Sequence, residues 1–112
     1  MTTTLNDVNL EAVAALTERI RENSRAARTT WRARVDWKGA FRSQATVREF
    51  APLHSDEPAG LGGGDSAPNP VEQLLAALGN CLAVGYAANA SVLGLAIDDL
   101  AIELEGDLDL HT

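Results

Sequence analysis

The fold of this chain is organised around residues 69–82, which read NPVEQLLAALGNCL. Asn69 can cap a helix, and Pro70 suits the first helical turn because the missing proline N–H would have no partner there. Apolar residues then recur at steps of three and four, which predicts a helix with one continuous hydrocarbon face. This face consists of Val71, Leu74, Leu75, Leu78 and Leu82. The stretch therefore predicts a long buried central helix, which also carries the only cysteine, Cys81.

The uncharged region around this helix is long. No charged residue occurs between Glu72 and Asp98, and about 25 residues are enough to span a bilayer. Polar residues and glycines interrupt the region, and much of the rest is alanine. We therefore favour a buried helix, a break between Asn89 and Gly94, and a following strand, and we expect no membrane partner.

Residues 1–28 are predicted to form an N-terminal helical extension. Thr4 or Asp7 could cap a helix that runs to about Ala27. Its predicted buried stripe consists of Leu10, Val13, Leu16 and Ile20. Arginines in its last turns would interact favourably with the negative end of the helix dipole.

A β-hairpin is predicted next. Residues 29–37 alternate between apolar and charged side chains, which is typical of a strand. A short turn at 38–40 leads into a second β-prone run at 41–50. Trp31 and Trp37 share one face of the first strand, and this predicts a core or dimer contact.

Residues 51–68 are rich in proline and glycine and predict a long loop, a kind of segment that is often functional. The three glycines at 62–64 lack the GK[ST] ending of a phosphate-binding loop, so we do not expect nucleotide binding. Near the end of the chain, residues 101–110 predict one further strand, with Ile102 and Leu104 on one face and acidic residues on the other.

Composition limits the class of protein. With 112 residues, 46% of them hydrophobic, residues 1–112 are expected to form a single domain with a modest core. One cysteine excludes an intrachain disulfide and a multi-cysteine metal site, and no secretory leader is evident. We therefore expect a cytoplasmic protein without metal or cofactor, in which His54 and His111 are surface residues.

The net charge of −7 is unevenly distributed. All nine basic residues lie in the first 48 positions together with five of the 16 acidic ones. The remaining acidic residues follow with no basic residue among them. This acidic balance argues against nucleic-acid binding, and it predicts that the two halves fold on each other or on a second copy of the chain.

The run LGGGDSAPNPVEQLLAALGNCL at residues 61–82 resembles the OsmC-like proteins, which include the organic hydroperoxide resistance enzymes (the OsmC/Ohr superfamily). Those proteins typically show a Gly-Gly loop, an Asn-Pro-(x)-Glu helix start and a peroxidatic cysteine at the end of an alanine-rich stretch. The resemblance implies an α+β OsmC-like fold with an intertwined homodimer. It also implies that the family fold continues beyond residue 112.

The resemblance also implies site residues. Cys81 matches the peroxidatic cysteine, Glu72 the motif glutamate, and Arg42 the arginine that pairs with it. An arginine could stabilise a thiolate, and a carboxylate could hold the planar guanidinium. The implied function is reduction of organic hydroperoxides in oxidative stress defence, with an external thiol as reductant because a resolving cysteine is absent. The alternative is a non-catalytic OsmC-like module that binds a small hydrophobic ligand or serves in assembly, with Cys81 as a small buried hydrophobe.

Overall fold

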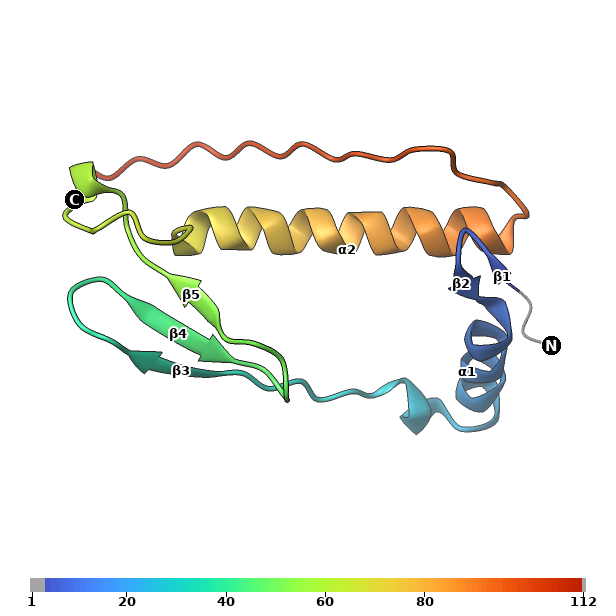
Figure 1. Ribbon diagram of the computed structural model, residues 1–112. Helices are drawn as coiled ribbons and strands as arrows, with labels where there is room; N and C mark the ends of the chain where they lie inside the picture. The colour runs from blue at the N-terminus through green and yellow to red at the C-terminus, as the bar shows by residue number, and fades with distance from the viewer. Residues whose placement is uncertain (1–3, 112) are drawn as a thin grey trace. The chain divides into compact units, whose positions relative to one another are not determined.

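The computed structural model of the protein describes residues 4–111 and is of the α+β class (Figure 1). The chain divides into two compact units, which we describe separately: residues 30–77, and residues 1–29 together with 78–112. The elements are strands β1 (Thr4–Leu5) and β2 (Val8–Asn9), helix α1 (Leu10–Glu22), a 3₁₀ helix (Ser24–Ala27), strands β3 (Arg34–Trp37), β4 (Ser43–Thr46) and β5 (Leu53–Ser55), a 3₁₀ helix (Ala59–Leu61) and helix α2 (Pro70–Val92).

The unit of residues 30–77 contains an antiparallel sheet with strand order β3-β4-β5. The predicted hairpin is confirmed as β3 and β4. Its turn is closed by two backbone bonds between Lys38 and Arg42 and between Arg42 and Gly39, with Gly39 at φ 99°. Glycine suits this left-handed conformation because it has no Cβ.

The prediction of a long loop at 51–68 was wrong in part. Residues 53–55 form β5, which pairs with β4, and residues 59–61 form a 3₁₀ turn. Pro52 lies just before this short edge strand, a position that proline tolerates because the ladder does not need its N–H. The loop itself therefore begins at Asp56, directly after β5.

Helix α2 begins and ends at the predicted signals. Its C-terminus is a Schellman motif, in which the Leu95 N–H bonds to the Ala90 carbonyl and the Gly94 N–H to the Ser91 carbonyl, with Gly94 at φ 76°. The 23 residues of α2 are long and apolar enough to cross a membrane by length and composition alone. A core helix of a soluble protein meets the same criterion.

The prediction that α2 is a buried helix was wrong for this chain by itself. Leu74 is 71% exposed and Leu78 51%, and Ser91 is the only buried residue of the helix. Within residues 4–111 no hydrophobic side chain is buried. The reason is that an amphipathic face is buried only against a second apolar layer. No part of the apolar face of α2 is completely covered by residues 4–111.

The N-terminal segment begins with a hairpin and not with the helix. Asn6 and Asp7 adopt φ values of 55° and 60° between β1 and β2, as the tight turn of a two-residue hairpin requires. Asn9 caps α1 by accepting a hydrogen bond from the Ala12 N–H. The predicted caps Thr4 and Asp7 were therefore wrong, because the hairpin moves the helix start to residue 10.

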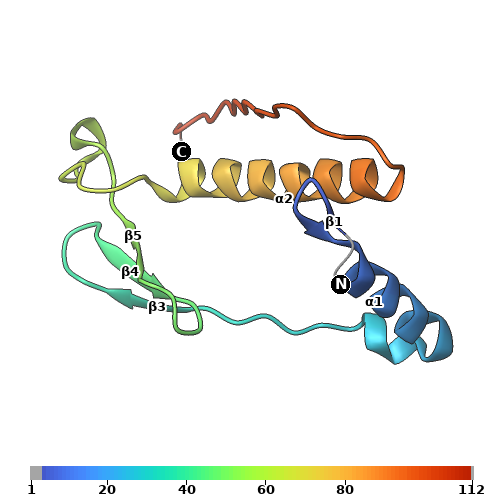
Figure 2. The same cartoon turned by 45° about the vertical axis from the view of Figure 1, so that its right-hand side comes forward.

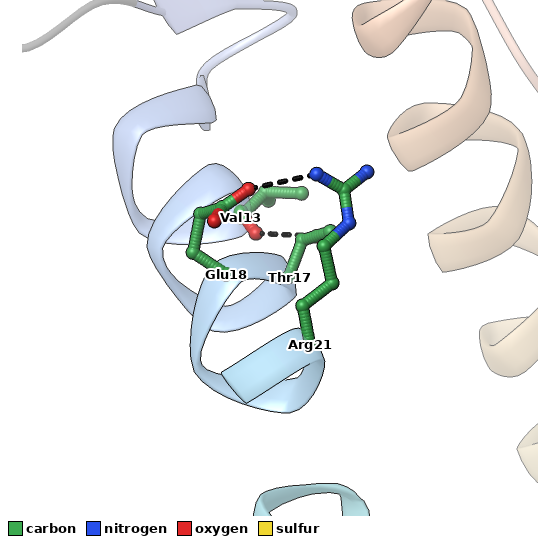
Figure 3. Close-up of polar contacts among 4 residues, drawn as sticks. All are labelled: Val13, Thr17, Glu18 and Arg21. Atoms are coloured by element: carbon green, nitrogen blue, oxygen red, sulfur yellow. Dashed lines mark hydrogen bonds and ion pairs between the residues drawn. The ribbon is translucent and has the colours of Figure 1, made fainter. Parts of the chain in front are cut away.

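Helix α1 ends earlier than predicted, at Glu22, and a 3₁₀ turn follows. Its exposed face carries two local contacts (Figure 3): the Thr17 hydroxyl donates to the Val13 carbonyl, and Arg21 forms an ion pair with Glu18 at 2.9 Å. An exposed pair of this kind contributes little to stability.

The Asn6 side chain ties this hairpin to the end of α2 within the same unit. Its amide donates to the Ser91 hydroxyl and the Leu95 carbonyl, and its oxygen accepts from the Ile97 N–H. Ser91 in turn donates to the Leu5 carbonyl. These bonds explain why Ser91 is buried although it is polar.

The predicted strand at 101–110 is not a strand in the structure. These residues are extended and run back alongside the part of α2 that belongs to their own unit, residues 78–92 (Figures 1 and 2), but they form no backbone ladder with any part of residues 4–111. Ile102 and Leu104 are half-buried, as the alternating pattern predicted. Gly79 makes room for the segment, because a Cβ there would lie 2.7 Å from the Leu104 Cδ1.

Candidate functional site

The start of α2 is a capping box. The Asn69 side chain accepts a hydrogen bond from the Glu72 N–H at 2.9 Å, and the Glu72 carboxylate accepts one from the Asn69 N–H at 3.0 Å. This reciprocal pair satisfies two N–H groups at the helix start. The local sequence Asn-Pro-x-Glu therefore has a structural reason in this chain.

Glu72 is exposed at this helix start. Its bond to the Asn69 N–H uses the Oε1 atom, and a carboxylate can accept about four hydrogen bonds. The cap is therefore compatible with a second interaction of the same side chain, for example with a guanidinium group.

Arg42 lies at the end of the β3–β4 turn and folds back over that turn. Its Nη2 donates to the Lys38 carbonyl at 3.2 Å. The same Nη2 would lie 3.3 Å from a Cβ at Gly39. Because the side chain is exposed, no packing prevents the guanidinium from moving to another partner.

The structure does not pair Arg42 with Glu72, although both belong to the unit of residues 30–77. The ion pairs among residues 4–111 are Arg21–Glu18 and Arg34–Asp36. Both are local in the sequence. The carboxylate–arginine pair implied by the family resemblance therefore stays a prediction.

Cys81 lies in the middle of α2, in the part that belongs to the other unit. The thiol is free and its residue is exposed, so the reading of Cys81 as a buried hydrophobe does not hold for the single chain. No described residue of its own unit forms a hydrogen bond with its Sγ. The pairing of this thiol with Arg42 stays a prediction.

An open hollow of about 320 Å³ runs along the helix beside Cys81. It is lined by Cys81, Leu82, Gly85, Tyr86 and Asn89. The Asn89 amide is turned back onto the helix, where it donates to the Gly85 carbonyl. The space beside Gly85 is open, since no neighbouring group lies within 4 Å of the position of an added Cβ.

Two polar residues near the helix start were missed by sequence reasoning. Gln73 donates from Nε2 to the carbonyls of His54 and Pro68, at 2.7 and 3.0 Å, and so ties α2 to β5. Asp56 is fully buried. Neither residue belongs to a local motif, because their partners are set by the path of the loop.

Comparison with known proteins finds one similar family. Residues 62–112 match the model of the family described as OsmC-like protein. No curated protein matches the chain at a significant level. The matched range contains Glu72 and Cys81, and Arg42 lies before it. The resemblance noted in the sequence is therefore confirmed over residues 62–112.

No metal site is evident in the described part of the chain. Residues 4–111 contain no group of three or more His, Cys, Asp or Glu side chains that could hold a metal ion. His54 and His111 are both exposed, as the sequence predicted for surface residues.

Proposed function

We propose that this protein is a thiol-dependent peroxidase that reduces organic hydroperoxides through Cys81. The observation that carries the proposal is that the range matched to the OsmC-like family contains Cys81, and that this thiol is exposed beside an open hollow. A peroxidatic cysteine must be reachable by its substrate. The coarser conclusion, similarity to the family over residues 62–112, does not depend on this activity.

The proposed reaction has two stages. The Cys81 thiolate attacks one peroxide oxygen, so that an S–O bond forms while the O–O bond breaks, and the alkoxide leaves as an alcohol after taking a proton. Cys81 is then a sulfenic acid. An external thiol forms a mixed disulfide with Cys81 and releases water, and a second thiol restores the cysteine. The external reductant is needed because the chain contains one cysteine.

Arg42 and Glu72 complete the proposed site. The guanidinium of Arg42 would stabilise the thiolate and the developing charge on the leaving oxygen. Glu72 would orient the guanidinium with its carboxylate. The exposure of Arg42 supports this role, since its present contact is a single bond to a backbone carbonyl.

The hollow beside Cys81 supports an organic rather than an inorganic peroxide. Leu82 and the ring of Tyr86 can contact a hydrocarbon substituent of the substrate. Hydrogen peroxide has no such substituent. The proposed enzyme therefore prefers peroxides with a bulky apolar group.

A second candidate function uses the same hollow without chemistry. In its own unit the thiol of Cys81 has no cationic partner among the described residues, and an inactive thiol would leave the hollow as a site for a small hydrophobic ligand or as an assembly surface. This alternative predicts that ligand binding survives replacement of Cys81.

We further propose that the protein is a cytoplasmic homodimer. Large hydrophobic side chains are exposed on α2, on β3 and in the C-terminal segment. Exposed apolar surface of this extent is typical of a protein interface. A single cysteine suits a reducing compartment.

The test is the intact mass of the protein after about one equivalent of cumene hydroperoxide in the presence of a sulfenic-acid trap, where one equivalent suffices for one thiol. We expect rapid formation of a single adduct that is absent in Cys81→Ser. The matched control Asn80→Ala changes an exposed neighbour and keeps the thiol, and it should label like the natural protein. Slow or absent labelling of the folded protein would reject the peroxidase and favour the binding module.

A further inference from the structure

Asp56 is the largest fully buried side chain in the described part of the protein. It lies directly after β5, at the start of the loop that leads to α2. A carboxylate is seldom fully buried unless its charge is compensated. Its partners therefore show what the loop is built around.

The compensation comes from four donors of the same loop. Oδ1 accepts from the N–H groups of Glu57, at 2.8 Å, and of Gly64, at 3.4 Å. Oδ2 accepts from Ser66, at 2.7 Å from the hydroxyl and 3.1 Å from the N–H. No cationic side chain takes part. The carboxylate of Asp56 thus binds Gly64 and Ser66, which lie eight and ten residues further along the chain.

These bonds also favour the charged form of Asp56. The hydroxyl of Ser66 and then the N–H groups of Glu57 and Ser66 lower the pKa of Asp56 to about 2, against the opposing effect of burial. The other titratable groups of the neighbouring segments are Glu57, Asp65, His54 and Glu72. None of their side chains is a hydrogen-bond partner of the Asp56 carboxylate.

The glycines of the loop are explained by this arrangement. A Cβ at Gly63 would collide with the Glu57 carbonyl oxygen, and one at Gly64 would lie 3.2 Å from the Asp56 Oδ2. Gly62 has φ 97°, a left-handed conformation. The run of glycines therefore serves to wrap the chain closely around a carboxylate, which gives it a role other than phosphate binding.

The wrapped loop is connected to the start of α2 inside the same unit. The Asp56 N–H donates to the Pro68 carbonyl at 3.4 Å. The same carbonyl accepts from Gln73 on the first turns of α2, and Gln73 also bonds to His54 on β5. The path from Asp56 through Pro68 to Gln73 is continuous.

We propose that Asp56 is a positioning residue: as a carboxylate it folds residues 57–66 onto the end of β5 and thereby sets where α2 begins relative to the sheet whose β3–β4 turn carries Arg42. Its effect on peroxide chemistry rests on the proposed function of Cys81. Its effect on the loop does not.

The first experiment compares Asp56→Asn with the matched control Asp65→Asn in the full chain. Asparagine at position 56 keeps the shape but turns an NH₂ group toward donors, whereas the Asp65 side chain has no hydrogen bond among the described residues. Hydrogen exchange at the amides of Gly64 and Ser66 should become at least about tenfold faster in Asp56→Asn and stay unchanged in Asp65→Asn. Unchanged protection in Asp56→Asn would overturn the proposal.

The second experiment follows protonation, which a merely space-filling role would not link to loop order. In the natural protein, NMR of the Asp56 carboxyl carbon should show titration near pH 2, together with loss of loop protection. In Ser66→Ala, which removes one donor, both events should move together to higher pH. This variant serves if Asp56→Asn does not fold. Titration near the ordinary pKa, or loop protection that does not follow it, would overturn the proposal.

The third measurement separates the two proposals. Sulfenic-acid formation at Cys81 should be at least about tenfold slower in Asp56→Asn than in Asp65→Asn, because a misplaced helix start disturbs the pairing of catalytic groups. If the natural protein itself does not react, the peroxidase proposal fails and the loop measurements still decide the role of Asp56. If the loop opens and the rate is unchanged, Asp56 orders the loop without positioning the reaction.

Discussion

The dual position of Glu72, at a helix cap and in the family motif, allows stability and activity to be tested separately. The perturbation is a set of three variants of the full chain: Glu72→Gln, Glu72→Ala and Asn69→Ala. Glutamine can keep the bond from its side-chain oxygen to the Asn69 N–H but carries no charge. Alanine at either position breaks the reciprocal pair seen at 2.9 and 3.0 Å.

The expected magnitudes follow from the geometry of the cap. Asn69→Ala removes the N-cap acceptor and should lower the free energy of unfolding by about 1 kcal/mol. Glu72→Gln removes a negative charge from the helix N-terminus, which should cost about 0.5 kcal/mol. Glu72→Ala should lie near Asn69→Ala, because one bond and the charge are lost together. A change of 1 kcal/mol alters the ratio of folded to unfolded protein about fivefold.

The assay is urea unfolding followed by far-UV circular dichroism, with all variants at one protein concentration because subunit association would shift the midpoint. Peroxide consumption is measured on the same samples. If Glu72 also orients Arg42, Glu72→Gln should slow peroxide consumption at least about a hundredfold while its stability loss stays small. A Glu72→Gln variant as unstable as Asn69→Ala, or an Asn69→Ala variant of natural stability, would refute the capping-box reasoning.

Further predictions concern the loop, the helix end, acid stability and association. Gly63→Ala should lower the melting temperature, because its Cβ meets the Glu57 carbonyl; an unchanged melting temperature would contradict this close approach. Gly94→Ala should cost about 1–2 kcal/mol in urea unfolding, because φ 76° is left-handed, and a neutral effect would count against the Schellman motif. Asp56 has a lowered pKa, so its contribution to stability is present above pH 4 and is lost as the pH falls toward 2; acid unfolding of Asp56→Asn should lack this component. Light scattering at micromolar concentration should give a dimer mass, and a monodisperse monomer would reject the dimer.

Local sequence signals predicted the elements that depend on near neighbours. Asn69 and Pro70 marked the start of α2, and its end lies within the predicted break between Asn89 and Gly94, because capping and helix termination involve residues within one turn. The β3–β4 hairpin was predicted for the same reason, since its turn and its alternating strand are continuous in the sequence.

The wrong predictions concern pairings across longer distances. The short run 53–55 becomes a strand only because β4 lies beside it, and residues 101–110 show the converse, a strand-like pattern without a ladder partner among residues 4–111. The start of α1 was placed too early because the N-terminal hairpin is held by bonds from Asn6 to residues near the end of α2. Such partners cannot be read from a local pattern.

The candidate site divides in the same way. Cys81 and Glu72 were identified from a continuous motif, and the family match contains both. Asp56 and Gln73 were missed, because a carboxylate in a glycine-rich loop has no signature until the loop closes around it. Arg42 was assigned by resemblance, and its contacts within its own unit lie on its own turn.

The amino-acid sequence alone determined the helix that carries the cysteine, its caps and the hairpin, because these depend on backbone preferences and side-chain bonds over a few residues. The tertiary structure decided which groups are buried. In this structure the apolar face of α2 is exposed, whereas the carboxylate of Asp56 is buried. Burial depends on which distant segments supply contacts and hydrogen-bond donors.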